Sequence, residues 1–174
     1  MKLLIIIFMF AVSGCTDATE DKKSTEKSEI CEISFKNIGP CVYGDIKVNL
    51  DFKKIATDEK ILQRLDVEKN GKKFSMNISK DTSMLDGDKG YISFADINFD
   101  SIPDISITTS FGLANLYMDY WVYDSGNKAY SYIGNFSSFK INNKSKTLSN
   151  VVKSSAAEYI NTTYTWNGLK LIKK

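Results

Sequence analysis

Histidine is absent from the sequence of 174 residues. This absence excludes catalytic triads and dyads in which histidine is the general base, and it excludes zinc sites with histidine ligands. The sequence also contains no glycine-rich phosphate-binding loop. A pair of carboxylates could still hydrolyse a glycoside, and Asp119, Asp124 and Glu158 are candidates. A solvated surface charge is the better interpretation of each, so we predict that the chain is not an enzyme.

A strong net charge is also lacking. The sequence holds 23 lysine and arginine residues against 21 aspartate and glutamate residues, which gives a formal net charge of +2. Nucleic-acid binding normally requires a clustered basic excess, so the composition does not indicate a nucleic-acid partner. Aromatic residues make up 12% of the chain, and together with the abundant isoleucine and threonine they favour strands over helices.

A long apolar run occurs at the N-terminus, where residues 3–12 follow a single lysine. The run is too short to span a bilayer as a mature helix and is typical of a secretory signal peptide. The residues Val12, Ser13, Gly14 and Cys15 resemble the lipobox of bacterial lipoproteins. This resemblance implies cleavage before Cys15 and a diacylglyceryl thioether on its sulfur. The alternative is an ordinary signal peptide with a cysteine near the cleavage site.

Thr16 follows the predicted lipidation site. An aspartate at that position would retain an enteric-type lipoprotein in the inner membrane, and the sequence has threonine instead. The similarity therefore implies an anchor on the periplasmic side of an outer membrane, with the lipid as the chain's contact to the membrane. The surface of a Gram-positive cell is the alternative localisation.

Residues 16–29 contain no apolar side chain larger than alanine. Such a segment cannot bury enough apolar surface to fold, so we expect a disordered tether between the lipid and the folded part. The remaining length suits one domain with a substantial core. The predicted organisation is a signal peptide over residues 1–14, the lipidated cysteine and tether over residues 15–29, and a single domain over residues 30–174.

Two cysteines, Cys31 and Cys41, remain when Cys15 is assigned to the lipid. Gly39 and Pro40 between them suit a loop, and an oxidising compartment favours a disulfide. Such a crosslink would stabilise the fold by about 2–3 kcal/mol through its effect on the unfolded chain. The alternative, a metal-binding or redox-active pair, usually has a tighter spacing and more ligands.

Short runs of alternating apolar and polar residues, separated by turn residues, continue through the rest of the chain. Asn70-Gly71 and Asn167-Gly168 are typical two-residue hairpin turns, and residues 124–127 are expected to form a further turn. The pattern predicts an all-β domain of antiparallel hairpins, either a sandwich or blades of a propeller. Residues 58–65 could form a short helix instead.

Oxygen-bearing side chains recur at alternate positions from Asp96 onward. The predicted metal ligands are Asp96, Asn98, Asp100, the carbonyl of Ile102, and Asp104. They stand at relative positions 1, 3, 5, 7 and 9 and provide the hard oxygen ligands that Ca²⁺ prefers. No glutamate follows at position 12, so the segment is not a complete EF-hand. It matches the shorter calcium turn that joins two strands.

Ser101 occupies the sixth position of this turn, where glycine is usual because φ is positive. A residue other than glycine costs roughly 1 kcal/mol in that conformation, which would reduce the affinity for the ion. Three aspartates around a divalent cation leave little Lewis acidity, so we expect a structural ion that fixes the hairpin and the loop after it. The alternative is an acidic turn whose carboxylates accept hydrogen bonds from its own backbone.

The segment Ser-Phe-Gly-Leu-Ala-Asn, residues 110–115, joins two apolar strands. An exposed Phe-Gly-Leu tip is unusual in a surface loop and suits insertion into a concave partner. The predicted partner-binding residues are Ser110, Phe111, Gly112, Leu113, Asn115 and Tyr117. The alternative is that Phe111 and Leu113 fold back into the core.

The order of these features resembles one family of periplasmic calcium-binding lipoproteins. Its members are immunity proteins against peptidoglycan-hydrolase effectors of bacterial-killing type IV secretion systems. The resemblance rests on residues 94–105, 117–124 and 164–171 and covers residues 72–174 best. It implies a truncated β-propeller with integrin-type, FG-GAP-like calcium turns, and it implies that residues 110–115 with Tyr117 enter the cleft of the hydrolase.

We therefore expect a lipid-anchored periplasmic inhibitor that blocks a lysozyme-type peptidoglycan hydrolase, with calcium as a structural cofactor. Phe111, Leu113 and Tyr117 would be its apolar anchors and Asn115 a polar contact. One alternative is a calcium-dependent binding module of the cell envelope that recognises a glycan or a partner protein. Another is a purely structural envelope lipoprotein.

Overall fold

The computed structural model describes residues 29–79, 82–111 and 113–174. The predicted signal peptide, Cys15 and residues 16–28 of the predicted tether lie outside the described residues. Glu29, predicted as the last residue of the tether, is instead the first residue of a strand, where it pairs with Phe94. Within the described ranges, no helix is long and apolar enough to cross a membrane.

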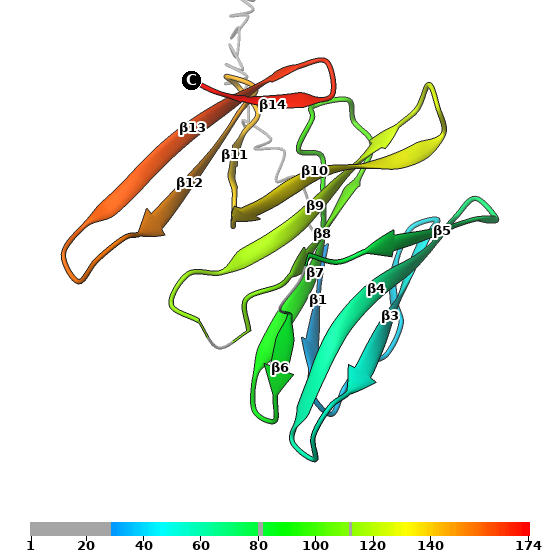
Figure 1. The fold of residues 1–174 in the computed structure, drawn as a ribbon. Helices are drawn as coiled ribbons and strands as arrows, with labels where there is room; N and C mark the ends of the chain where they lie inside the picture. The colour runs from blue at the N-terminus through cyan, green and yellow to red at the C-terminus, as the bar shows by residue number, and fades with distance from the viewer. Residues whose placement is uncertain (1–28, 80–81, 112) are drawn as a thin grey trace, which may run out of the picture.

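Fourteen strands form three antiparallel sheets, and the described residues contain no helix (Figure 1). Sheet A contains, in spatial order, β1 (Glu29–Ser34), β7 (Lys89–Ala95), β8 (Asp104–Thr108), β9 (Tyr117–Asp124) and β10 (Ala129–Ser137). Sheet B contains β2 (Cys41–Tyr43), β3 (Ile46–Lys54), β4 (Glu59–Lys69) and β5 (Lys72–Asn77), and β6 (Ser83–Leu85) pairs with β4. Sheet C contains β11 (Lys140–Asn142), β12 (Thr147–Lys153), β13 (Tyr159–Asn167) and β14 (Lys170–Lys173).

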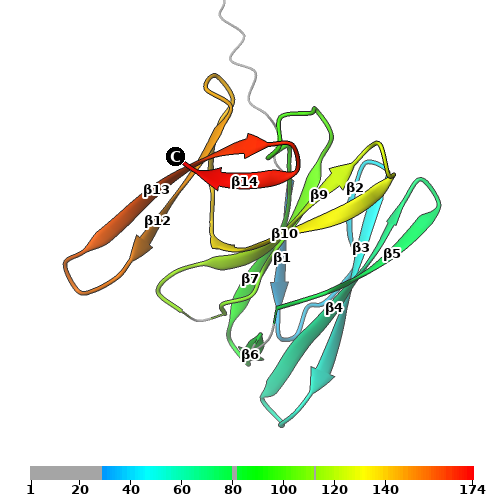
Figure 2. The same cartoon turned by 45° about the horizontal axis from the view of Figure 1, so that its top comes forward.

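The prediction of an all-β fold built from antiparallel hairpins is confirmed. Each sheet contains four strands that are consecutive in the chain and adjacent in space, a meander of the kind found in propeller blades. The sheets pack against each other in layers, as in a sandwich. Sheet A lies between sheets B and C in both views (Figures 1 and 2).

The alternative of a helix over residues 58–65 is wrong, because residues 59–65 belong to β4. Leu62 and Leu65 are both buried although they are three residues apart, a spacing typical of a helix. A β-bulge explains the spacing: the pairing of β3 with β4 shifts between Asp51 and Phe52, so the extra residue Gln63 resets the alternation.

One of the predicted turns occurs as expected, and two are shifted by one residue: the turn predicted at residues 124–127 comprises residues 125–128, because Asp124 pairs with Ala129. Asn70 and Gly71 both have positive φ and join β4 to β5, as a type I′ turn requires. Asp124 accepts hydrogen bonds from the N–H groups of Gly126 and Asn127 in the turn after β9. In the last hairpin, however, Asn167 pairs with Lys170, so the turn residues are Gly168 and Leu169. Positive φ at Gly168 suits the first position of a type II′ turn.

The hydrophobic core has two parts, one on each face of sheet A. On one face, residues such as Phe94, Ile105 and Trp121 pack against buried residues of sheet B. On the other face, Tyr120 and Val122 pack against sheet C. Every residue of β8 is buried, because this strand is central in sheet A and both of its faces are covered.

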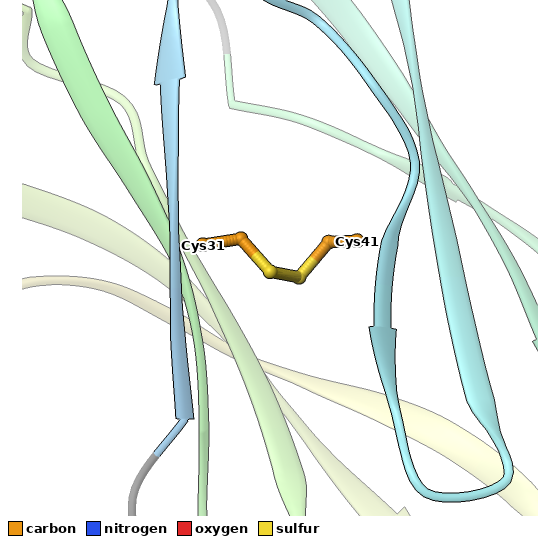
Figure 3. Close-up of a disulfide and its surroundings, with 2 residues drawn as sticks. All are labelled: Cys31 and Cys41. Atoms are coloured by element: carbon orange, nitrogen blue, oxygen red, sulfur yellow. A yellow bond between two sulfur atoms is a disulfide. The ribbon is translucent and has the colours of Figure 1, made fainter.

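Cys31 and Cys41 form a disulfide, as predicted. The bond joins β1 of sheet A to β2 of sheet B (Figure 3). It therefore holds together two of the three layers, close to the point where the described chain begins.

Replacing both cysteines with alanine, Cys31→Ala with Cys41→Ala, should lower the free energy of unfolding by about 2–3 kcal/mol, because the unfolded chain gains conformational entropy. Equilibrium urea unfolding measures this difference. Cys15→Ser is the matched control and should unfold at the same urea concentration as the wild type. If the double variant also matched the wild type, the disulfide would contribute nothing to stability.

Candidate functional site in the β7–β8 turn and the β8–β9 loop

Asp104 is the centre of the β7–β8 turn. It is the first residue of β8, and its side chain is only 2% exposed. Its Oδ2 accepts hydrogen bonds from the backbone N–H groups of Ile97 (2.9 Å) and Asn98 (3.3 Å). Its Oδ1 accepts one from the N–H of Tyr123 on β9 (2.9 Å). One carboxylate therefore closes the turn and attaches it to the neighbouring strand.

The side chains of the other predicted ligands also accept hydrogen bonds from the backbone of the turn. Asp96 accepts from the N–H groups of Asp100 (3.0 Å) and Ser101 (2.8 Å). Asn98 Oδ1 accepts from the N–H of Asp100 (3.2 Å), and Asp100 Oδ1 from that of Ile102 (2.8 Å). Ser101 has a φ of 68°, the positive value expected at the sixth position of a calcium turn.

The arrangement of these side chains is that of a turn satisfied by its own backbone. Within the described ranges, no group of three or more His, Cys, Asp and Glu side chains is placed to hold a metal ion. The residue types nevertheless suit calcium, since each of the three carboxylates accepts at most three hydrogen bonds and keeps at least one of its roughly four acceptor sites. A calcium ion at this turn stays a prediction.

Two features of the turn were not expected from the sequence. The indole N–H of Trp166 on β13 donates to the carbonyl of Ile97 (2.6 Å), so sheet C also holds the turn. Burial raises the pKa of Asp104 to about 7, although the N–H groups of Tyr123 and Ile97 favour its charged form. The negative charge of Asp100 raises the same pKa further.

The β8–β9 loop is closed at its base by Ser110. The Ser110 hydroxyl donates to the carbonyl of Asn115 (2.8 Å) and accepts from the N–H of Tyr117 (2.6 Å). The Asn115 side chain pairs with the backbone of Lys153 at the end of β12, through its Nδ2 and Oδ1 atoms (3.1 and 2.9 Å). Ser110 and Asn115 thus position the loop.

Phe111 does not belong to an exposed tip, which corrects its prediction as a partner-binding anchor. It is 6% exposed and is part of the core between sheets A and B. Its ring fills the space above Gly90, where a Cβ atom would lie 2.3 Å from Phe111 Cε1. Leu113 differs, because it is 69% exposed. Tyr117 is half-buried, and Gly112 lies outside the described residues.

Asp119 is wholly buried in the middle of β9. Its carboxylate accepts hydrogen bonds from the Ser79 N–H (2.6 Å), the Tyr132 hydroxyl (3.0 Å) and Asn135 Nδ2 (2.8 Å). Burial and the charge of Asp119 raise the pKa of Tyr132 to about 12. The network links the end of β5 to sheet A, so Asp119 positions two sheets and is not a surface charge.

The three candidate carboxylates lie in different surroundings. Asp124 accepts hydrogen bonds in its own turn after β9, and Glu158 is exposed just before β13. The sequence contained a signal for the burial of Asp119. Asp119 lies inside the apolar strand of residues 117–124, whereas Asp124 is the last residue of that strand and Glu158 lies outside it. A strand that is buried on both faces places the carboxylate of an interior residue inside the protein.

A groove lies between β6 and the β8–β9 loop, with a cavity volume of about 500 Å³. Figure 1 shows these two elements side by side. One side is formed by Glu59, Ser83, Leu85 and Asp88, and the other by Ser110, Phe111, Leu113 and Tyr117. We call this hollow the β6 groove. It was not predicted, because its two sides are distant in the sequence.

Comparison of the chain with protein-family models, with curated proteins and with solved structures found no match. The functional interpretation therefore depends on the residues of the chain itself.

The pKa of Asp104 predicts how stability changes with pH. Because the pKa in the folded chain lies above the ordinary value of 3.8, the folded chain binds this proton more tightly than the unfolded chain. The free energy of unfolding should therefore fall as the pH rises from about 4 to about 7. This loss amounts to roughly 4 kcal/mol at most.

Urea unfolding between pH 4 and pH 8, in the presence of EDTA, measures the change. Asp104→Asn should be less stable than the wild type at pH 4, since an amide cannot accept all three backbone N–H groups. Its stability should nevertheless vary less with pH. Equal pH dependence in the two proteins would contradict a raised pKa at Asp104.

Proposed function

We propose that the chain is a non-catalytic exported protein that inhibits a lysozyme-type peptidoglycan hydrolase by occluding its cleft. The observation that carries this proposal is the β8–β9 loop, which is fixed at its base and presents Leu113 to solvent with 69% of its surface exposed. An apolar side chain on a fixed loop loses little conformational entropy on binding, which favours affinity.

The five predicted partner-binding residues that the structure describes divide into two groups. Leu113 and Tyr117 are exposed or half-buried and would contact the hydrolase. Ser110, Phe111 and Asn115 would act indirectly, because their hydrogen bonds or packing hold the loop in place. Leu113 would therefore be the main apolar anchor, and Phe111 its support from the core.

The cellular setting of the proposal follows from the cysteines. A disulfide between Cys31 and Cys41 suits the oxidising compartments outside the cytosol. Lipidation of Cys15 would hold the protein on the periplasmic side of an outer membrane, or on the cell surface of a Gram-positive bacterium. Peptidoglycan is accessible to hydrolases in both places, so inhibitor and target would meet there.

Calcium would have a structural role in this proposal. Asp96, Asn98, Asp100, the Ile102 carbonyl and Asp104 would hold the ion. Its charge would offset the repulsion among the aspartates and the cost of burying the Asp104 carboxylate. The turn leads directly into β8, and β8 leads into the loop that carries Leu113. Binding of the ion would thus make the loop more rigid.

A second candidate function is binding of an envelope glycan. The β6 groove favours it, because the groove combines the ring of Tyr117 with the hydroxyl groups of Ser83 and Ser110. Aromatic rings beside hydroxyl groups are suited to a ligand with both apolar and polar faces. The glycan would then be the ligand itself, and no enzyme would be inhibited.

The inhibitor proposal predicts a stoichiometric effect in a turbidity assay of cell-wall lysis. The full-length chain in a non-ionic detergent should slow a lysozyme-type muramidase, or the hydrolase encoded in the adjacent reading frame. Leu113→Asp should weaken inhibition by about tenfold or more, because it places a charge in an apolar contact. Leu169→Asp is the matched control, since Leu169 is 43% exposed in the distant β13–β14 turn.

The control variant should inhibit as well as the wild type. If the wild type slowed neither hydrolase at a stoichiometric dose, the inhibitor proposal would be wrong. If Leu113→Asp inhibited as strongly as the wild type, the loop would not be the contact surface.

The calcium prediction is tested by calorimetry with CaCl₂. The wild type should release or absorb heat on binding, whereas Asp100→Ala should not. Asp124→Ala is the control, because Asp124 also accepts hydrogen bonds in an exposed turn but is not one of the predicted ligands. At 100 times its dissociation constant, calcium should stabilise the wild type by about 2.7 kcal/mol in thermal unfolding. Equal heats for the wild type and Asp100→Ala would refute the site.

A further inference from the structure

We propose that the β6 groove receives a lysine or arginine side chain of the partner protein. The inference rests on the proposed function, because the partner is taken to be the inhibited hydrolase. The inference adds a second contact with the partner besides Leu113, in which a basic side chain of the partner enters an acidic groove of this chain. The groove is adjacent to the expected contact surface, since Leu113 and Tyr117 both line it. A partner that covers Leu113 would therefore also cover the groove.

The sides of the groove provide apolar surface for the stem of a long side chain. Leu85 is 50% exposed on β6, and Leu113 is 69% exposed on the opposite loop. Tyr117 adds an aromatic ring on the same side as Leu113. Lysine and arginine commonly place their methylene groups along such apolar surface while the charged end reaches a polar site. The cavity of about 500 Å³ has room for such a side chain.

Two carboxylates in the groove are oriented by neighbouring groups. Glu59 accepts a hydrogen bond from the hydroxyl of Ser83 on β6, which pairs with Ile61 two residues further along β4. Asp88 Oδ2 accepts one from the backbone N–H of Leu85 (2.9 Å). Each contact uses one carboxylate oxygen, so acceptor capacity remains on both residues.

These carboxylates have no cationic partner in the described part of the chain. The adjacent lysines make their contacts elsewhere. Lys60 Nζ donates to the carbonyl of Phe35 (2.8 Å) and lies over its ring, and Lys89 Nζ pairs with Glu32 (2.9 Å). Successive residues of a strand point to opposite faces, which explains why Lys60 and Glu59 diverge.

The described lining of the groove therefore carries negative charge without compensation. It contains Glu59 and Asp88 but no lysine or arginine; Lys80 and Asp81, which have opposite charges, lie outside the described residues. A cationic group with an aliphatic stem complements both the charge and the apolar sides. A neutral glycan would match the hydroxyl groups but would leave the charges unpaired.

The inference is tested first with the peptides acetyl-Gly-Lys-Gly-amide and acetyl-Gly-norleucine-Gly-amide. The full-length chain, with labelled leucine methyl groups, is titrated and followed by NMR. The lysine peptide should shift the Leu85 and Leu113 signals, and added salt should weaken its binding. The norleucine peptide, which has the stem without the charge, should shift them little. Equal shifts with both peptides, or shifts with a chito-oligosaccharide alone, would overturn the inference.

The variant Glu59→Gln with Asp88→Asn should weaken binding of the lysine peptide roughly two- to fivefold for each charge removed. Asp58→Asn with Asp86→Asn is the matched control. It removes the same charge from neighbouring positions outside the groove lining, where Asp86 pairs with Lys36. A control that lost as much affinity as the groove variant would overturn the inference, because the effect would then reflect net charge.

The hydrolase assay separates this inference from the proposed function. If the wild type inhibits and the groove variant inhibits equally well, the groove inference is wrong and the inhibitor proposal stands. If the wild type inhibits no hydrolase, the inhibitor proposal fails, and the peptide titration alone decides whether the groove binds a basic side chain. Unchanged leucine methyl signals in the free variants would show that they are folded.

Discussion

The centre of the molecule depends on the hydrogen bonds that the carboxylate of Asp104 accepts. This carboxylate accepts hydrogen bonds from the backbone of the β7–β8 turn and from Tyr123 on β9, so a single group joins three consecutive strands of sheet A. Burying it carries a cost that its N–H partners only partly offset, as its raised pKa indicates. A bound cation would reduce this cost, which gives a physical reason for aspartates to gather in the turn.

The central position of sheet A also explains how the β8–β9 loop is held. Side chains of the loop contact both neighbouring sheets. Phe111 enters the core shared with sheet B, and Asn115 pairs with the backbone at the end of β12 in sheet C. Ser110 closes the base between them. Because these three anchors occupy most of the segment, Leu113 is the large side chain left for solvent.

Local patterns in the sequence predicted the strands, the hairpins and the disulfide, because alternation, turn chemistry and cysteine number are properties of short segments. Contacts between distant segments could not be predicted in this way. The bulge at Gln63 gave β4 a helical spacing. Phe111 is buried because its ring fills the space above Gly90, whereas Leu113 is exposed. The hydrogen bond from Trp166 to Ile97 and the β6 groove likewise depend on the packing of sheets.

The proposed recognition surface contains residues from two sheets, so its shape depends on the contacts that hold the two sheets together. Glu59, Leu85 and Asp88 come from sheet B and the residues that follow it, whereas Leu113 and Tyr117 come from the loop of sheet A. Their relative position therefore depends on the contacts that join sheets A and B. The buried Asp119 network with Ser79 and the Cys31–Cys41 disulfide both make such contacts. These links would preserve the distance between the charged and apolar parts of the surface. Ser79 and Asn135 of the Asp119 network also line the groove itself.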